Sequence, residues 1–560
     1  MKNYKIDQVT ELGEKFFIYN EKDNNKKIYL NSNFSSEKEA DKFVKQVNPD
    51  QLNIIIGIGN GAIIKKLTTI DFVQCLIIEP FEDVELDDNI IDIIEKQKNI
   101  SFYYYKDISS LIINEYIKKY LGLKTNILIH PRYEKTNVEI LKETVNVVKN
   151  GTIMLQVNRN TEMFFKKDWI IEPLLNLRYT LSLPSITKFH NKFEGEAAFL
   201  VASGPSLKEN LHLLKKMKDK AYIFAVGSAL NGLLSDEIIP DFVTVIDSSI
   251  KNYSAHFKGV NYSGPLIVSG MVNSNIIEKH DGYSILANLN IDSITTNFRK
   301  DVPAFPSVPS VSVFTLQILY YLGFSTVYLV GQDLALLNGE YYAKDIKVHM
   351  KSNTFEPQLY VESNNGSRVG TLYSLYAHLQ SFNDLITLFD KQKLRIYNLS
   401  ENGAKIKDVD YLPANSVELI KEKKYINVNS ILEKSTYENN NFVINDFILQ
   451  IKAVQKKTDE ILSKLNKINH TAVSLNDLKK VLKLFKELRN QDIIENIFIK
   501  QLSFYVQKLN NKFEYTFEKE IITNQDRIEM VKDIVNLVEE IQKYFKEILD
   551  DERILDLIYE

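Results

Sequence analysis

The spacing of apolar residues changes twice along the 560-residue chain. Near the front, "LNIIIGIGNGAIIKKL" (52–67) combines a short apolar run, a glycine-rich turn and the start of a helix. A second strand of the fully buried type, "CLIIEP" (75–80), follows it. Because a strand–helix–strand order is typical of a parallel, helix-covered sheet, we predict a Rossmann-like α/β domain over residues 1–160.

The glycine-rich turn of this first domain has two interpretations. Gly57, Gly59 and Gly61 could bring backbone N–H groups close to a ligand, and Glu79 falls about where an acid that binds a ribose would lie. Alternatively, the glycines only make a tight turn and allow close helix packing. A spaced glycine triplet does not separate the two, so the sequence leaves ligand binding at this turn open.

The middle of the chain, residues 161–425, alternates apolar runs with helical segments, which predicts a central Rossmann-like domain with a mostly parallel sheet. Its strand candidates are "AAFLVAS" (197–203), "AYIFAVG" (221–227), "DFVTVID" (241–247), "PLIVSG" (265–270), "TVYLVGQD" (326–333) and "LRIYNLS" (394–400). Most of them end near a polar side chain, namely Ser203, Asp247, Ser269, Asp333 and Asn398. Since ligands of open α/β sheets bind at the carboxyl ends of the strands, these side chains are predicted to converge on one site.

The last part of the chain differs because no glycine or proline follows Pro413. Long helices exclude these residues, whereas strands and tight turns need them. The segment "SLNDLKKVLKLFKELRN" (474–490) places its apolar residues on one helical face, and Ser474 with Asp477 offers a capping box. We therefore predict an all-α domain over residues 426–560.

Composition excludes several classes of protein. A formal net charge of −4 gives no electrostatic basis for binding nucleic acid. The single cysteine, Cys75, excludes a disulfide framework and fits a reducing compartment. The N-terminus has no apolar core of signal-peptide length, and no later run approaches the length of a membrane span. We expect a cytoplasmic protein that binds neither nucleic acid nor membrane.

The loop Ser203-Gly204-Pro205-Ser206 joins the first central strand to a helix. Gly204 permits the close approach of a ligand, Pro205 sets the backbone for entry into a helix, and Ser206 can cap that helix. The unpaired N–H groups and the dipole of a helix terminus favour an anion, typically a phosphate. The alternative is that the loop merely starts a helix.

Several motifs in this order resemble those of the motility-associated factor (Maf) glycosyltransferases. They are "FLVASGPSLKENLHLLKK", "AYIFAVGSALNGLLSDEIIPDFVTVIDSS", "VSVFTLQILYYLGFSTVYLVGQDLA" and "IYNLSENGAKIKD", with "FSSEKEADKFV" and "IIIGIGNG" nearer the front. The resemblance covers nearly the whole chain. Maf proteins modify flagellin with nonulosonic acids, which are sugars of the sialic-acid kind. The central domain also resembles, more distantly, bacterial sialyltransferases that use a CMP-activated sugar.

The resemblance implies a glycosyltransferase that moves a nonulosonic acid, of the pseudaminic or legionaminic type, from CMP to Ser or Thr of flagellin. It implies no required cofactor or metal, because Tyr341 and Tyr342 would stabilise the leaving phosphate, with Tyr342 matching the family's tyrosine. The residues expected to bind the nucleotide sugar are Ser203, Gly204, Pro205, Ser206, Ser228, Asp247, Gln332, Tyr341, Asn398, Ser400, Asn402 and Gly403.

The general base is expected elsewhere, because the sialyltransferases' catalytic histidine aligns with Thr371. We predict His349, which lies in polar sequence just beyond the tyrosines and titrates in a suitable range. Asp333 is expected to act beside it and Tyr342. His256 and His378 are weaker candidates, and His378 lies in an amphipathic segment typical of a structural role.

Two other functions are compatible with the sequence. Archaeal 6-hydroxymethylpterin pyrophosphokinases resemble the central domain in its Gly-Pro-Ser and Gly-x-Asp motifs. Such an enzyme would use ATP, with magnesium held by carboxylates such as Asp247 and Asp333. These kinases are short single-domain chains, so the additional domains here disfavour this interpretation. The third is a non-catalytic flagellin-binding chaperone, which predicts that no nucleotide binds.

Overall fold

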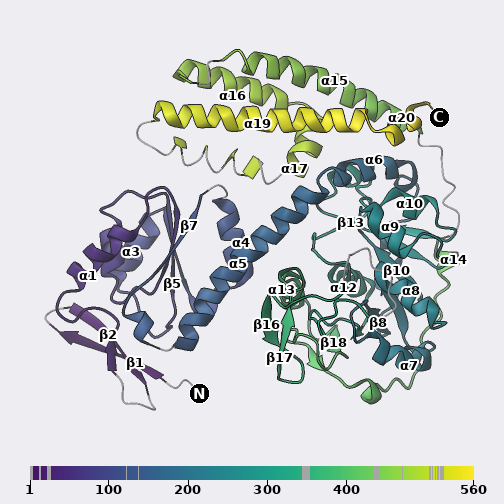
Figure 1. Cartoon of the computed structure of the whole chain (residues 1–560), viewed down its shortest axis with the longest axis horizontal. Coiled ribbons are helices and arrows are strands. Elements are labelled where there is room, and N and C mark those ends of the chain that lie inside the picture. The colour runs from purple at the N-terminus through teal and green to yellow at the C-terminus, as the bar shows by residue number, and fades with distance from the viewer. Residues whose placement is uncertain are drawn as a thin grey trace. The chain divides into compact units, whose positions relative to one another are not determined.

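Figure 1 shows the computed structural model of the chain. It describes residues 4–11, 14–21, 27–120, 123–136, 138–343, 353–432, 441–468, 471–502, 506–507, 509–510, 513, 516–517 and 522–559. The chain divides into two compact units. One comprises Met1–Gln156 and Phe504–Ile522, and the other Val157–Ser503 and Thr523–Glu560. The division into three domains at residues 160 and 425 stays a prediction.

The first unit contains an antiparallel sheet and a parallel one. The antiparallel sheet is β1 (Tyr4–Glu11), β2 (Glu14–Glu21) and β3 (Lys27–Tyr29). The parallel sheet has the order β6-β5-β4-β7, from β4 (Leu52–Ile56), β5 (Gln74–Glu79), β6 (Ile100–Tyr104) and β7 (Thr125–Ile129). The helices are α1 (Ser36–Phe43), α2 (Ala62–Leu67), α3 (Asp88–Lys96) and α4 (Ser110–Lys119), with short turns η1 (Val44–Gln46), η2 (Tyr105–Asp107) and η3 (Tyr133–Lys135). This arrangement confirms the predicted Rossmann-like fold.

Side chains of the protein itself occupy the space around the glycine-rich turn. A Cβ atom on Gly57 would lie 2.6 Å from the ring of Tyr133, and one on Gly59 would lie 2.0 Å from Asn31 Oδ1. Both glycines have a positive φ. The turn is therefore closed by the chain's own packing, which favours the second of the two interpretations left open by the sequence.

Glu79 also serves the turn. One carboxylate oxygen accepts from the N–H of Ile58 at 3.0 Å and from the Tyr133 hydroxyl at 2.7 Å, and the other accepts from the N–H of Phe81 at 3.0 Å. Burial raises the pKa of Glu79 to about 7, against the lowering effect of these hydrogen bonds. Glu79, which under one of the two interpretations would bind a ribose, is fully buried and holds the turn together.

We expect Gly59→Ala to destabilise the first unit by about 1–3 kcal/mol, because the new methyl group meets Asn31 and the positive φ becomes strained. Gly195→Ala is the matched control, since Gly195 has a positive φ but nothing lies within 4 Å of its added Cβ. Denaturant titration of each variant measures the loss. Equal losses for the two variants would contradict the packing argument.

The second unit is built on an eight-stranded parallel sheet with the order β12-β11-β10-β9-β8-β15-β18-β19. Its strands are β8 (Ala197–Val201), β9 (Tyr222–Val226), β10 (Phe242–Val245), β11 (Leu266–Val268), β12 (Ser284–Leu286), β15 (Thr326–Val330), β18 (Arg395–Asn398) and β19 (Asp410–Tyr411). Each neighbouring pair is parallel. Every central strand predicted from the sequence is present.

Smaller strands and helices complete this unit. The strands are β13 (Asn288–Leu289) with β14 (Ala304–Phe305), and the hairpin β16 (Leu359–Glu362) with β17 (Arg368–Thr371). The helices are α5 (Val138–Phe165, which begins in the first unit), α6 (Asp168–Thr180), α7 (Leu207–Met217), α8 (Gly227–Ser235), α9 (Ile250–His256), α10 (Ser274–Glu278), α11 (Ser293–Phe298), α12 (Val311–Leu322), α13 (Tyr373–Thr387) and α14 (Val428–Ile431). Short turns are η4 (Ile186–Phe189) and η5 (Ala414–Ser416).

The strand order places a topological switch between β8 and β15. From β8 the sheet is extended on one side by β9, β10, β11 and β12, whereas β15, β18 and β19 extend it on the other. Val201 pairs with Val330 at the carboxyl ends of the two central strands. The crevice where chains diverge at such a point is where open α/β sheets bind their ligands.

The C-terminal region is helical, as predicted. Its elements are α15 (Asn441–Leu465), α16 (Leu475–Arg489), η6 (Ile494–Phe498), α17 (Ile499–Gln501), α19 (Asn524–Leu549) and α20 (Glu552–Tyr559). Figure 1 shows α15, α16 and α19 lying side by side. The capping box of Ser474 and Asp477 is confirmed. None of the helices that the structure describes is long and apolar enough to cross a membrane.

Candidate active site

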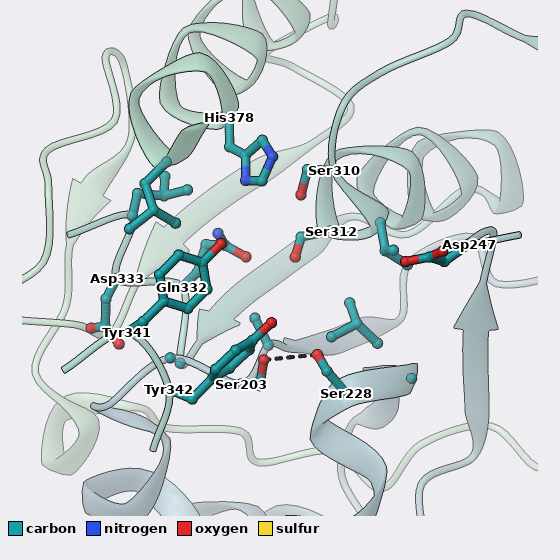
Figure 2. A pocket seen from close by; sticks show the side chains of 18 of the residues that line it. Ser203, Ser228, Asp247, Ser310, Ser312, Gln332, Asp333, Tyr341, Tyr342 and His378 are labelled. Carbon is teal, nitrogen blue, oxygen red and sulfur yellow. Dashed lines mark hydrogen bonds between the residues drawn. The ribbon is translucent and has the colours of Figure 1, made fainter. Parts of the chain in front are cut away.

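A cavity of about 230 Å³ lies at the carboxyl ends of β8, β9, β10 and β15 (Figure 2). The predicted site residues that line it are Ser203, Gly204, Ser228, Asp247, Gln332, Asp333, Tyr341 and Tyr342. Ser203 and Ser228, from neighbouring strand ends, share a hydrogen bond of 2.7 Å between their hydroxyls. Of the side chains expected to converge at the strand ends, Ser203, Asp247 and Asp333 line the cavity, whereas Ser269 and Asn398 do not.

Other predicted residues lie elsewhere. Pro205, Ser206, Asn398, Ser400, Asn402 and Gly403 are not among the residues that line the cavity. The Asn402 side chain accepts from Asn365 at 2.9 Å, and Thr371 donates to the backbone oxygen of Leu334 at 2.9 Å. His349, the predicted base, falls in residues 344–352, outside the described part of the chain.

The start of α7 holds a carboxylate of the protein itself. Ser206 is the N-cap residue, but its side chain makes no capping hydrogen bond, so the expected side-chain cap is wrong. The N–H of Ser206 instead donates to Asp333 Oδ2 at 2.9 Å. We expected the N-terminus of α7 to bind a phosphate, but the N–H of its N-cap residue is instead hydrogen-bonded to Asp333.

Asp333 joins three segments of the chain. The Ser400 hydroxyl donates to Oδ1, the Ser206 N–H donates to Oδ2, and the N–H of Ala404 donates to the Asp333 backbone oxygen at 2.7 Å. Burial raises the pKa of this carboxyl, against the lowering effect of Ser400 and Ser206. In Figure 2 the carboxylate points away from the centre of the cavity. Both oxygens therefore bind within the protein.

Two glycines make this junction possible. A Cβ atom on Gly204 would lie 2.3 Å from Asp333 Oδ2 and 2.5 Å from the Gly331 carbonyl oxygen. One on Gly403 would lie 2.5 Å from Ser400 Oγ. Gly204 and Gly403 thus allow close packing around Asp333, and the polar turn at 398–403 supports Asp333 from outside the cavity.

Tyr341 and Tyr342 both point their rings into the cavity (Figure 2). The Tyr342 N–H donates to Asn353 Oδ1 at 2.8 Å, and the N–H of Ala343 donates to the Ser203 carbonyl at 2.9 Å. Burial raises the pKa of Tyr342 to about 12, with a further contribution from the charge of Asp247, and burial also raises that of Tyr341. Both phenols therefore stay protonated at neutral pH and can donate hydrogen bonds.

The N-terminus of α12 opens on the same cavity. Ser310, Val311 and Ser312 line it, and Figure 2 shows the two serine side chains facing the space. Ser310 is the N-cap residue, but its side chain makes no capping hydrogen bond. The first N–H groups of a helix lack intrahelical partners and carry partial positive charge. This terminus, more than that of α7, can bind an anion.

Sequence reasoning missed Ser310 and Ser312, although a signal existed. A helix that leads into a parallel strand runs antiparallel to it, so its N-terminus lies at the carboxyl edge of the sheet. The segment Pro309-Ser310-Val311-Ser312 begins the helix before β15, and its hydroxyls therefore had to lie near the strand ends.

His378 and His256 also line the cavity. His378, in the second turn of α13, is hydrogen-bonded to the backbone of Pro309, which offers only a carbonyl acceptor. Burial lowers the pKa of His378 to about 4, so the ring is neutral at pH 7. One ring nitrogen thus carries the proton given to Pro309, and the other is a bare acceptor. The assignment of His378 to a structural role from its amphipathic segment missed this placement.

The charges around the cavity are unusual for an anion site. Among the described residues that line it there is no Lys or Arg. Gln332 and Thr244 line it as well, and each has a buried side-chain oxygen without a protein partner. In the described part of the chain, no group of three or more His, Cys, Asp or Glu residues gathers in a metal-binding arrangement. A ligand would meet hydroxyls, phenols, a helix terminus, the side-chain amides of Asn252 and Gln332, two histidines and the carboxylate of Asp247.

Comparison with known proteins gives a family match over the central part of the chain. Residues 172–339 match the family described as 6-hydroxymethylpterin diphosphokinase MptE-like. An uncharacterized protein of Treponema pallidum (strain Nichols) is 24% identical over 135 residues, which are 24% of this chain and 60% of that protein. The chain therefore spans 60% of the length of this relative.

A solved structure extends the comparison to the whole chain. The structure of the Maf glycosyltransferase from Magnetospirillum magneticum AMB-1 is similar with a TM-score of 0.51 and 13% sequence identity. The similarity covers 100% of this chain and 95% of that protein. Over its full length, the chain therefore has the fold of a Maf glycosyltransferase, which confirms at the level of the fold the resemblance seen in its motifs.

Proposed function

We propose that the protein is a cytoplasmic glycosyltransferase that transfers a nonulosonic acid from its CMP donor to Ser or Thr hydroxyls of flagellin. The observation that carries the proposal is the pairing of two neutral phenols, Tyr341 and Tyr342, with the uncapped N-terminus of α12 in one cavity at the topological switch. The motifs that resemble Maf proteins, and the fold shared with one, support the choice of donor and acceptor.

The geometry suits the chemistry of this reaction. The bond between the anomeric carbon and a phosphate oxygen breaks, and negative charge grows on the departing CMP while the sugar becomes oxocarbenium-like. Donors fixed before the reaction stabilise such charge most effectively. The phenols of Tyr341 and Tyr342 can donate to the phosphate, and the α12 terminus can hold the second anionic group, the sugar carboxylate.

The new bond forms between the anomeric carbon and the acceptor oxygen, which loses its proton to a base. His349 was predicted for this role. We propose His378 as the alternative, because its neutral ring lines the cavity and its hydrogen bond to the Pro309 carbonyl leaves the other ring nitrogen without a proton. Asp333 acts in the proposal as a positioning residue, because Ser206 and Ser400 take both of its carboxylate oxygens.

A pterin diphosphokinase is the second candidate, favoured by the family match over residues 172–339. It would need magnesium held by Asp247 and Asp333. The donor set fits this poorly, because Asp333 is engaged within the protein and Asp247 Oδ1 accepts from the N–H of Ser249 at 2.8 Å. Tyr341, Tyr342 and His378 also lie beyond the matched residues.

Calorimetry on the full-length protein separates the candidates. We expect CMP to bind in EDTA, with an affinity that magnesium changes by less than about twofold, because phenols and a helix terminus replace a metal. ATP with magnesium should give no binding heat. The reverse pattern would select the pterin kinase, and no binding of either nucleotide would select the chaperone.

A further inference from the structure

A chain of polar contacts leads from the C-terminal helix α20 to the wall of the cavity. Arg553 Nη1 donates to Glu172 Oε1 at 2.8 Å. Glu172, on α6, is only 2% exposed. Its other oxygen, Oε2, accepts from the backbone N–H of Ser274 at 2.7 Å, at the start of α10. A buried carboxylate thus connects a residue near the C-terminus to the segment after β11.

The contacts continue from this segment to the cavity. The buried Asn273 side chain donates to Glu172 Oε1 at 3.4 Å and to the Ser248 carbonyl at 3.2 Å. The backbone N–H of Asn273 donates to the Asp247 carbonyl at 3.1 Å. Asp247 lines the cavity, and its carboxylate in turn accepts from Asn252, which also lines it, at 3.4 Å. The wall at 247–252 therefore rests on Asn273 and Glu172.

Arg553 is a cation that pairs with Glu172 and with Asp551, at the start of α20, and it also acts on the charge of Asp168. It lowers the pKa of Glu172, which burial raises, and it lowers that of Asp168, which burial and the charge of Asp247 raise. Burying a carboxylate is costly unless a counter-charge and hydrogen bonds compensate. Without Arg553, the ionised form of Glu172 would lose its cation, and the acceptor that holds Ser274 would be weakened.

We propose that Arg553 is a positioning residue for the cavity: through Glu172 and Asn273 it fixes the segment 247–249, and so couples the C-terminal helix α20 to ligand binding. Arg553 is not among the residues that line the cavity, so its effect on the ligand would pass through Glu172 and Asn273. Coupling is reciprocal, so a ligand that orders the wall also stabilises the contact of α20, and a protein partner that displaces α20 weakens ligand binding. The ligand readout of this inference rests on the proposed function, with CMP as the probe.

The test compares Arg553→Met with a matched control in the full-length protein. We expect R553M to bind CMP about 5- to 20-fold more weakly by calorimetry. Amide hydrogen exchange in peptides covering 247–252 and 273–276 should become faster without ligand. The control is Lys166→Met. Lys166 pairs with Glu540 of α19 at 3.2 Å, so this substitution removes an ion pair of the helical region that does not involve Glu172. It should leave both measurements unchanged.

A double variant separates the specific contact from general loosening. In R553M/E172Q the buried charge is absent, and the glutamine oxygen can still accept from Ser274, although its NH2 group cannot replace the acceptor of Asn273. We expect this variant to recover the slow exchange at 273–276 and part of the CMP affinity. The inference is overturned if R553M binds CMP like the wild type and exchanges at the same rate at 247–252, or if K166M has the same effect as R553M. If the wild type does not bind CMP, the proposed function fails, while faster exchange confined to R553M still supports the coupling.

Discussion

Replacing both Tyr341 and Tyr342 with phenylalanine is expected to lower kcat by about 10²–10³-fold, with a much smaller change in CMP affinity. The two hydroxyls face the cavity from one segment, with ring centroids 4.7 Å apart. Their donation matters most when charge grows on the departing phosphate, so the loss falls mainly on the transition state. Single-turnover transfer to flagellin measures the rate, and calorimetry measures the affinity.

The substitution removes only oxygen atoms, so the rings keep their packing. Tyr328→Phe is the control, because Tyr328 lies in β15, stacks on Tyr397 with 5.6 Å between ring centroids, and does not line the cavity. It should leave kcat unchanged. Full activity of the Y341F/Y342F variant would show that the leaving phosphate is stabilised by other groups, and a return of its activity with added magnesium would point to a metal in that role.

The sheet and part of the site could be predicted because buried parallel strands leave a strong signal. The runs that became β8, β9, β10 and β15 are apolar almost throughout, and polar residues follow each of them. The carboxyl-end rule then brings Ser203, Asp247 and Asp333 together without knowledge of the strand order.

The sequence did not reveal the order of the strands in the sheet, and this order determines which strand-end residues reach the cavity. Asn398 ends β18, which lies beyond β15 and away from β8, so the turn that follows contacts Asp333 from behind. The sequence therefore predicts at which edge of the sheet a polar residue at a strand end lies, but not whether its side chain enters the cavity or packs behind it. The same limit applies to Gly204, whose missing side chain makes room for Asp333, although its sequence context suggested room for a ligand.

Residues on helices were harder to predict. His378 lies one and a half turns into α13, and only the direction of that helix relative to the sheet brings it to the cavity. Its apolar neighbours form the buried face of α13, which is why the segment looked purely structural. A side chain at the edge of a helix's apolar surface can pack in the core, but it can also line a cavity that this surface borders.

Removing the general base should have the second large effect on the rate. We expect His378→Ala to lower kcat by about 10²–10⁴-fold while CMP affinity is nearly unchanged. The neutral ring accepts the proton, so activity requires the unprotonated form. With the pKa of His378 lowered to about 4, kcat/KM should hold down to about pH 4 and fall below it. A base with an ordinary histidine pKa, as expected for His349, would instead lose activity as the pH falls through about 6.5.

A second measurement does not depend on activity. Because folding lowers the pKa of His378, the unfolded chain binds a proton at a higher pH than the folded one. Its contribution to stability is therefore fully present above about pH 6.5 and is lost as the pH falls towards about 4. The Tm of His378→Gln should consequently fall less than that of the wild type between pH 7 and pH 4.5.

The two histidines can then be assigned by comparing the single alanine variants. If His378 is the base, H378A is slow at every pH, and kcat/KM of H349A still falls only when the pH drops to about 4. If H349A is the slow variant and the wild-type rate falls near pH 6.5, the base belongs to the polar segment beyond the tyrosines, and His378 serves only to hold Pro309 at the start of α12. That second outcome still predicts an effect of His378→Ala, but on affinity: releasing Pro309 would disturb the terminus that binds the anion, so the loss would fall on Kd for CMP-sugar and not on kcat.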